Sequence, residues 1–314
     1  EIRLSLVGSE MCIRDRLKAF DRENEVFKKR VGKDRVMATY RARVRARNHV
    51  AAFIKSFYRR SDMSMLELTP DFIKEFAAYL STEAGLRNGS IWANCMWLKG
   101  VVMKAHYNGL IPRNPFIQFH ISPNVKEREY LTEDELKAVM THEFADSKLA
   151  YIRDIFIFAS FTALSFVDIQ ELTNDNIVEV NGEKWILSKR HKTKVAFQVK
   201  LLDIPLQIVE RYRPMQKDNR IFPGLNYWSI CKPLKRMIRE CGITKSISFH
   251  CSRHGFATLA LSKGMPIESV SRVLGHTNIV TTQLYAKITT QKLDNDLTMF
   301  GDKLSKTFNG ITMS

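Results

Sequence analysis

The stretch His250-Cys251-Ser252-Arg253 is followed along the chain by Leu274-Gly275-His276 and then by Tyr285. A phenol attacks a phosphodiester only when cations and hydrogen-bond donors neutralise the phosphate and a proton reaches the leaving oxygen. Taken singly, Tyr285 is typical of a half-buried core aromatic, His276 of a helix-end histidine and Arg253 of a surface charge. Two imidazoles, a guanidinium and a phenol in this order and spacing instead indicate a phosphoryl-transfer site.

This ordered set resembles the second catalytic box of the tyrosine recombinases, the phage-integrase family, which reads His-x-x-Arg, then Leu-Gly-His, then a tyrosine. The resemblance is close over residues 130–314 and looser before them. It implies that the Tyr285 oxygen attacks the scissile phosphate, leaving a 3′-phosphotyrosyl link and a free 5′-hydroxyl. The hydroxyl can attack back and reseal the strand, so the implied reaction needs neither ATP nor a metal or other cofactor.

The box residues suit the binding of a phosphate. Arg253 offers a planar fork of donors that lysine lacks. Gly275 is expected to end a helix that starts near Pro266, and that turn directs the His276 imidazole. His250 lies one helical turn before Arg253, so both can face the same phosphate if the segment is helical. Cys251 is interpreted as a packing residue and not as a nucleophile.

The resemblance also implies a general acid, a lysine on a β-hairpin that protonates the leaving 5′-oxygen. Lys192-Thr193 fits this position, with Val199-Lys200-Leu201 as the following strand, and Lys194 is the alternative. A different interpretation stays open, because the basic cluster here can equally face the DNA backbone. The cluster comprises Lys189, Arg190, Lys192 and Lys194.

One position departs from the family pattern. The first box normally reads Thr-Gly-Leu-Arg, whereas this chain has Thr162-Ala163-Leu164-Ser165, with Asp168 where an acidic residue is expected. Serine cannot replace a phosphate-binding arginine, so either the protein is inactive or another cation takes over. Arg190 is our candidate, because two residues before Lys192 it would emerge on the same face of a strand. Arg153 is the alternative.

The Arg-x-Lys-Thr arrangement with serine in the first box resembles the integrases of Bacteroides-type mobile elements, which favours a compensated enzyme over an inactive one.

Composition supports a polyanionic partner. The chain of 314 residues is long enough for two domains and carries 49 Lys and Arg against 33 Asp and Glu, a formal net charge of +16. Such an excess suits DNA, although ribosomal and membrane-surface proteins share it. No apolar run is long enough for a transmembrane segment. Five cysteines without a CxxC pair indicate a reducing cytoplasm rather than a disulfide framework or a zinc site. With the family resemblance, the expected location is the cytoplasm of a bacterium.

The first part of the chain predicts a small helical domain. Residues 1–16 resemble a translated sequencing adapter and are left out of the fold prediction, and residues 17–35 are taken as an N-terminal extension. Residues 36–120 have a helical, basic pattern, with one helix starting at Thr69-Pro70 and another over residues 88–108. An ordinary bundle with a basic face fits as well, but the position before a recombinase-like domain matches the family's DNA-clamping core-binding domain. The candidate DNA-binding residues are Arg41, Arg43, Arg45 and Arg47.

Residues 121–129 are predicted to be a linker and residues 130–314 the catalytic domain with its C-terminal tail. Thr132 and Glu135 form a capping-box pattern at the start of a helix, and residues 152–164 predict a buried helix. Short strands are expected over 177–180, 184–188 and 196–201, with Asn181-Gly182 as a type I′ turn. The predicted fold class is therefore mainly α with a small antiparallel β-sheet, an α+β catalytic domain behind a helical one.

The leading functional hypothesis is a site-specific recombinase that binds double-stranded DNA as a homotetramer and integrates, excises or inverts a mobile element, with or without a DNA-bending accessory protein. Two alternatives remain: a type IB topoisomerase-like enzyme that nicks and reseals one strand, and a degenerate integrase kept for DNA binding. Beyond Tyr285, an apolar face can pack on its own domain or on a neighbouring subunit. Its candidate residues are Ile288, Leu293, Leu297 and Phe300.

Overall fold

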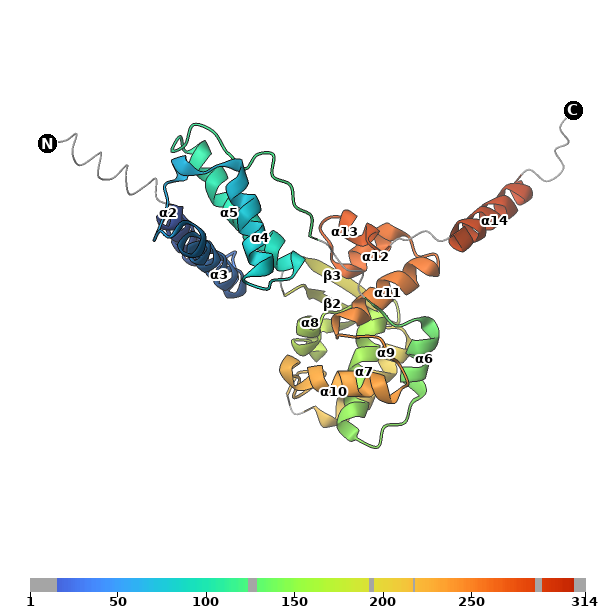
Figure 1. Cartoon of the computed structure of the whole chain (residues 1–314). Helices are drawn as coiled ribbons and strands as arrows, with labels where there is room; N and C mark the ends of the chain where they lie inside the picture. Colours follow the sequence, from blue (N-terminus) through green and yellow to red (C-terminus); the bar gives the residue numbers. More distant parts are fainter. Residues whose placement is uncertain (1–15, 124–128, 192–194, 217, 286–289, 308–314) are drawn as a thin grey trace, which may run out of the picture. The chain divides into compact units, whose positions relative to one another are not determined.

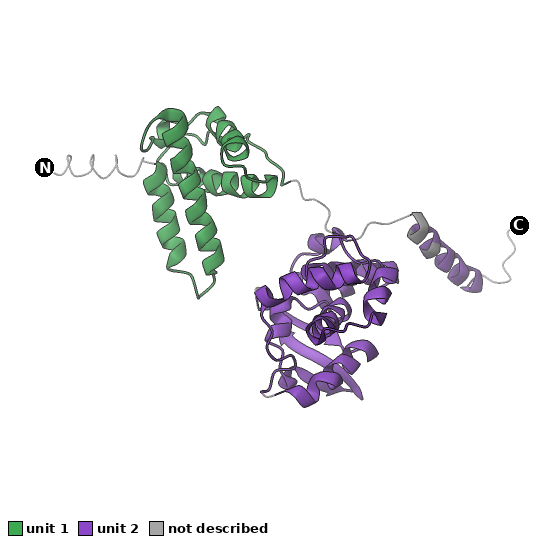
Figure 2. Ribbon diagram, turned by 60° about the horizontal axis from the view of Figure 1, so that its bottom comes forward, with its two compact units in different colours: residues 1–126 green, residues 127–314 purple. Residues whose placement is uncertain are grey.

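The computed structural model describes residues 16–123, 129–191, 195–216, 218–285 and 290–307. The chain divides into two compact units, Glu1–Lys126 and Glu127–Ser314 (Figure 2). Most described residues are helical, and a three-stranded antiparallel sheet belongs to the second unit (Figure 1). The predicted fold class is confirmed. Among the described residues, no helix combines the length and the apolar character that a bilayer crossing demands.

The described part of the first unit is a bundle of four α-helices. They are α2 (Arg16–Lys28), α3 (Met37–Phe53), α4 (Pro70–Thr82) and α5 (Asn88–Tyr107). Helix α3 continues into a π-helical turn, Ile54–Tyr58, and Arg59 ends it in the left-handed conformation. Helix α2 packs against α3 and α5, and α4 packs against α5. The bundle therefore encloses a single core, in which Phe53, Phe72 and Phe76 are fully buried or nearly so.

Helix α4 begins where the sequence predicts, with Pro70 at the first helical position after Thr69. Proline is suited to this place because the first helical amide has no acceptor within the helix. The buried stripe of the helix consists of Phe72, Ile73, Phe76 and Leu80. This spacing places the four side chains on one face, which packs into the core of the unit.

The bundle begins earlier in the chain than we predicted. We predicted that residues 17–35 form an extension and that Arg16 belongs to a leader. In the structure, Arg16 and the first part of this extension form helix α2. Leu17 and Phe20 are buried in the core of the first unit, and the Arg16 guanidinium carbon lies 4.0 Å from the centre of the Phe72 ring. With so few buried apolar residues, this charged helix gives a weak periodic signal in the sequence. Packing against α3 and α5 stabilises the helix.

The second unit is built around helix α7 (Ser147–Thr162), which is buried along most of its length and packs against α6, α9, α10 and α11. Helix α6 (Glu133–Thr141) starts with the predicted capping box: the Thr132 hydroxyl accepts from Glu135 N, and the Glu135 carboxylate accepts from Thr132 N. The other helices are α8 (Phe166–Gln170), α9 (Asp203–Tyr212), α10 (Tyr227–Glu240), α11 (His250–Ser262), α12 (Ile267–Leu274), α13 (Val280–Gln283) and α14 (Thr290–Thr307).

The sheet has the order β1–β2–β3, with strands β1 (Ile177–Val180), β2 (Glu183–Lys189) and β3 (Ala196–Lys200). Asn181 and Gly182 connect the first two with φ values of 53° and 77°, as a type I′ turn requires. In the register, Ile186 of β2 lies between Ile177 of β1 and Val199 of β3. Helix α12 packs against β3, so the sheet and the C-terminal helices meet at the point where the candidate residues gather.

Candidate active site

Helix α11 carries the His-x-x-Arg box at its first turn, as predicted. His250 is the first residue of the helix and is exposed, whereas Arg253 is 8% exposed. Cys251 is buried in the main core of the second unit, in agreement with its interpretation as a packing residue. The start of α11 therefore presents an imidazole to solvent and holds a guanidinium beneath the surface.

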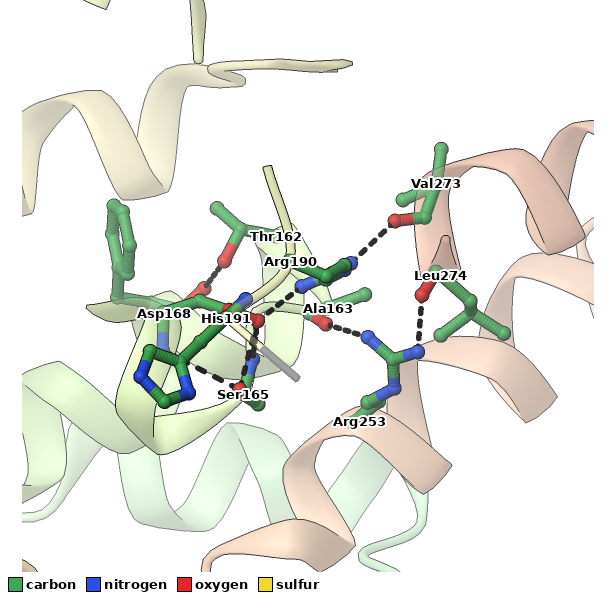
Figure 3. A network of polar contacts seen from close by, with 10 residues as sticks. Thr162, Ala163, Ser165, Asp168, Arg190, His191, Arg253, Val273 and Leu274 are labelled. Atoms are coloured by element: carbon green, nitrogen blue, oxygen red, sulfur yellow. Dashed lines mark hydrogen bonds and ion pairs between the residues drawn. The ribbon is translucent and has the colours of Figure 1, made fainter. Parts of the chain in front are cut away.

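Arg253 connects three segments that are distant in the sequence. Its Nη1 donates a hydrogen bond to the Ala163 carbonyl at 2.8 Å, and its Nη2 donates to the Leu274 carbonyl (Figure 3). Burial and the nearby positive charge of Arg190 lower the pKa of Arg253 to about 10. The group is still a cation at neutral pH, and the ends of α7 and α12 fix its plane.

Arg190 lies next to the first box, where the family's arginine is missing. Its Nη1 is 2.7 Å from an Asp168 carboxylate oxygen, and its Nη2 donates to the Val273 carbonyl at 2.7 Å (Figure 3). The guanidinium carbon stands 4.1 Å from the centre of the Phe197 ring, and the residue is 5% exposed. Arg190 directly follows the last residue of β2, so the expectation that it lies in the strand was wrong. Its alternation with Lys192, which lies outside the described residues, stays a prediction.

Ser165, which occupies the position of the family's first-box arginine, has a structural role. It caps α8, and its hydroxyl donates to the Asp168 carboxylate at 2.7 Å. Burial opposes ionisation of Asp168, but hydrogen bonds from the His191 amide, Arg190 and Ser165 keep its pKa below the usual value. Asp168 is therefore a buried carboxylate that holds the Arg190 side chain in position.

Gly275 ends α12 in the left-handed conformation, with φ of 61°, as predicted. A methyl group at Gly275 would lie 2.9 Å from Arg190 Nε and 3.0 Å from Arg190 Cγ. Glycine is therefore required here both by the backbone conformation and by the arginine underneath.

We expect Gly275→Ala to lower the strand-cleavage rate by at least about tenfold, because the methyl group must displace Arg190 and the left-handed backbone costs alanine about 1 kcal/mol. A single-turnover assay on a nicked duplex would measure the reduction. Gly264→Ala is the matched control, since Gly264 is also left-handed, with φ of 89°, but no described atom lies within 4 Å of its added methyl. Equal rates for the two variants would contradict the prediction.

His276 follows this turn and is half-buried. Its Nδ1 lies 2.9 Å from the hydroxyl of Thr282, which is fully buried. Burial, together with the charges of Arg253, Arg190 and nearby His250, lowers the pKa of His276 to about 4. The imidazole is thus neutral at pH 7, and the tautomer that donates from Nε2 must accept the Thr282 hydroxyl proton at Nδ1.

We expect Thr282→Val to reduce cleavage about tenfold, by removing a hydrogen bond of about 1–1.5 kcal/mol, and Thr282→Ser to restore it. An NMR titration of the parent should find His276 neutral down to pH 5. Because its folded pKa lies below the usual value, its contribution to stability is complete above about pH 6.5 and declines towards pH 4. A normal His276 pKa, or a valine variant as fast as the parent, would contradict this account.

The ring of Tyr285 lies near two imidazoles. The His276 ring is nearly parallel to it, at 13° and 6.4 Å between ring centres, and the His254 ring is edge-on, at 71° and 4.8 Å. Tyr285 is half-buried against a small apolar cluster that includes Ala257 and Leu274. The structure thus gathers Arg190, Arg253, His276 and Tyr285 from four segments of the chain.

Several other sequence candidates lie elsewhere. Lys192 and Lys194 lie outside the described residues, and Lys189 is exposed at the end of β2. Arg153 pairs with Asp154 at 2.9 Å and donates to the His142 carbonyl. Arg153 lies ten positions before Ala163, the residue that ends α7, about 15 Å along the helix, which is too far for it to replace the missing arginine.

The four arginines of α3 do not share one environment. Arg41 and Arg45 are exposed, and Arg47 is half-buried and forms two hydrogen bonds to Asp21, at 2.8 and 2.9 Å. Arg43 was predicted to face DNA, but it is buried: its Nε donates to Asn24, and its guanidinium lies over Trp97. In an α-helix, residues two positions apart point to nearly opposite sides. Arginines at every second position therefore cannot all lie on one face of α3.

Two residues at the site were missed in the sequence. His254 lies four residues after His250 on the same helix face, and this spacing was a usable signal. Thr282 gave no signal, because its contact with His276 depends on how the chain turns between α12 and α13.

Comparisons with known proteins identify the family of the chain. The phage integrase family model matches residues 129–292, and the phage integrase SAM-like domain model matches residues 17–121. The first match alone spans more than half of the chain. The chain belongs to the phage integrase family.

Relatives within this family include the tyrosine recombinase XerA of Pyrococcus horikoshii, 32% identical over 177 residues, which are 52% of this chain and 58% of XerA. The tyrosine recombinase XerC of Lactobacillus leichmannii is 25% identical over 68% of this chain and 77% of its own length. The chain thus spans less than two thirds of XerA, but more of XerC.

Solved structures show the same integrase fold. The Tn1549 transposon integrase in complex with circular intermediate DNA has a TM-score of 0.74 at 16% identity, over 90% of this chain and 99% of that one. A lambda integrase bound to a COC′ core site has a TM-score of 0.68 at 15% identity, over 91% and 80%.

Proposed function

We propose that this phage integrase is a site-specific DNA recombinase that cuts and rejoins strands through a 3′-phosphotyrosyl intermediate at Tyr285. The observation that supports the proposal best is the position of Arg190, which provides a second buried guanidinium beside Arg253 although Ser165 occupies the usual arginine position. The degenerate-binder alternative rested on Ser165, and Arg190 removes its main support.

In the proposed reaction, Tyr285 Oη forms a bond to phosphorus as the bond from phosphorus to the 5′-oxygen breaks. Arg190 and Arg253 neutralise the non-bridging oxygens, and neutral His276 donates a hydrogen bond to the same phosphate. The tyrosine proton leaves to water or to a neighbouring base, and the departing 5′-oxygen takes a proton from the general acid, for which Lys192 is our candidate. In resealing, the 5′-hydroxyl attacks phosphorus and Tyr285 leaves.

Two features of the free site favour an anionic ligand. Arg190 and Arg253 are both buried, and each charge lowers the free energy of binding a phosphodiester placed between them. Asp168 balances one of the charges, so the pair carries a net positive charge. A phosphodiester with one negative charge would complete the neutralisation.

We further propose that the protein assembles on double-stranded DNA as a homotetramer, with or without an accessory DNA-bending protein, and that it mobilises a genetic element in a bacterial cytoplasm. Of the candidate DNA-binding residues, Arg41, Arg45 and Lys189 are exposed and remain candidates for binding phosphates, and Arg47 is half-buried and paired with Asp21. Substituting any one phosphate-binding cation by alanine should make the salt dependence of DNA affinity less steep.

The test uses the full chain and a randomised pool of nicked duplexes, from which covalent protein–DNA adducts are isolated under denaturing conditions and sequenced. A defined cleavage sequence with parent protein, and no adducts with Tyr285→Phe, is the expected result. Plasmids that carry two copies of the recovered site then separate recombination from simple relaxation of supercoils. Sequence-specific DNA binding without adducts under any condition would contradict the proposal.

A further inference from the structure

His254 packs against the ring of the proposed nucleophile, Tyr285. It directly follows Arg253 on α11, and its ring is edge-on to Tyr285 at 71°, with 4.8 Å between the ring centres. On its other side it meets His250, at 83° and 5.2 Å. His254 therefore connects the exposed start of α11 with the ring of Tyr285.

The phenol of Tyr285 needs such support because of where it lies in the chain. It follows the short helix α13, and its amide donates to the Thr282 carbonyl at 3.0 Å. An attacking atom misplaced by about 1 Å can cost about 10²-fold in rate, so the contacts that hold the Tyr285 ring bear directly on catalysis. Edge-to-face contacts between aromatic rings restrict both the position and the tilt of the ring.

We infer that His254 is a positioning residue that holds the Tyr285 ring in line with the scissile phosphate. This inference rests on the proposed function. Arg253, the preceding residue, is a proposed phosphate ligand and is held by hydrogen bonds to the Ala163 and Leu274 carbonyls. His254 contacts the nucleophile. One turn of α11 thus fixes both reacting partners, so a change in α11 geometry affects their alignment directly.

A pair of reactions separates positioning of the tyrosine from activation of the phosphate. The first is single-turnover cleavage of a nicked duplex by Tyr285. The second is strand joining in a Tyr285→Phe background, with a DNA strand that ends in a 3′-(4-nitrophenyl) phosphate. There the 5′-hydroxyl of the other strand forms a bond to phosphorus, the bond to 4-nitrophenolate breaks, and the hydroxyl proton passes to water. The second reaction uses the phosphate site but not the tyrosine.

We expect His254→Ala to slow cleavage at least about tenfold and to leave joining within about twofold of its background. His254→Phe keeps an aromatic edge against Tyr285 and should recover most of the cleavage rate. His250→Ala, one turn earlier on the same face, is the contrasting variant, and it should slow both reactions because His250 is a proposed phosphate ligand.

Equal reductions in both reactions for His254→Ala, or undiminished cleavage, would overturn the inference. Failure of the phenylalanine variant to recover activity would also overturn it, since the contact would then not be aromatic in nature. The proposed function fails in a different way, by the absence of adducts with the parent protein.

Discussion

Arg190→Ala is expected to lower the rate of strand cleavage by about 10³-fold, as large an effect as removing a principal donor to a developing oxyanion. The reason is the position of Arg190. Its guanidinium is buried between Asp168 and the Val273 carbonyl, close enough to Arg253 to lower the pKa of that residue. Single-turnover cleavage of a nicked duplex measures the effect.

The alanine variant leaves the buried Asp168 carboxylate without its cation, and loss of one partner of a buried ion pair can destabilise a protein by about 3–5 kcal/mol. A second variant separates this effect from catalysis. Arg190→Gln with Asp168→Asn replaces the ion pair by a neutral, hydrogen-bonding pair of similar size, so the fold should remain while the phosphate clamp is removed. Thermal unfolding and DNA affinity show whether the variants are folded. Cleavage by the folded double variant within about tenfold of the parent would assign the clamp to another residue.

Arg253→Lys should reduce cleavage by about 10²–10³-fold although the charge is kept. Arg253 donates from two different nitrogens to carbonyls on two segments, Ala163 at the end of α7 and Leu274 at the end of α12. A lysine ammonium cannot span both carbonyls and a phosphate in one plane. The reduction is therefore expected in the chemical step, with DNA affinity changed far less.

Lys263→Arg provides the converse control, because Lys263 is a cation on the same stretch of chain that pairs with Glu133 away from the site. Parent-like cleavage is expected there. If Arg253→Lys also cleaved at the parent rate, the forked geometry of Arg253 would be irrelevant to catalysis, and its role would be limited to the framework contacts.

Much of the second unit could be predicted because its signals are local. The capping box at Thr132, the turn at Asn181-Gly182 and the end of α12 at Gly275 each depend on a few neighbouring residues with one favoured backbone conformation. The same reasoning placed the His250–Arg253 box on a helix. Arg190 was predicted from a strand alternation, but it lies just beyond the end of β2 and meets the first box through Asp168.

The errors concern contacts between distant segments. Arg43 pairs with Asn24 across two helices, and no local pattern distinguishes it from the exposed Arg41 and Arg45. Helix α2 was missed because only two of its apolar residues, Leu17 and Phe20, are buried, and they pack against other helices of the first unit. Thr282 was missed because the hydroxyl meets His276 only after the chain has turned. In each case, contacts between segments that are distant in the sequence stabilise the observed position. The local sequence pattern carries no information about such contacts.

The site also explains why serine is tolerated in the first box. Ser165 caps α8 and binds Asp168, and Asp168 in turn holds Arg190. An arginine at position 165 would take the place of this capping serine, and the hydrogen bonds of the cap would be lost. We therefore interpret Ser165, Asp168 and Arg190 as one unit, in which the cation is supplied from the β2–β3 hairpin instead of from α8.

Identification of the residue that carries DNA after cleavage tests the central claim most directly. The covalent complex formed on a nicked duplex would be digested with nuclease and protease, and its peptides analysed by mass spectrometry. A nucleotide attached through its 3′-phosphate to Tyr285, and absent from Tyr285→Phe, is the predicted result. DNA attached to any other residue, or attached through a 5′-phosphate, would contradict the account.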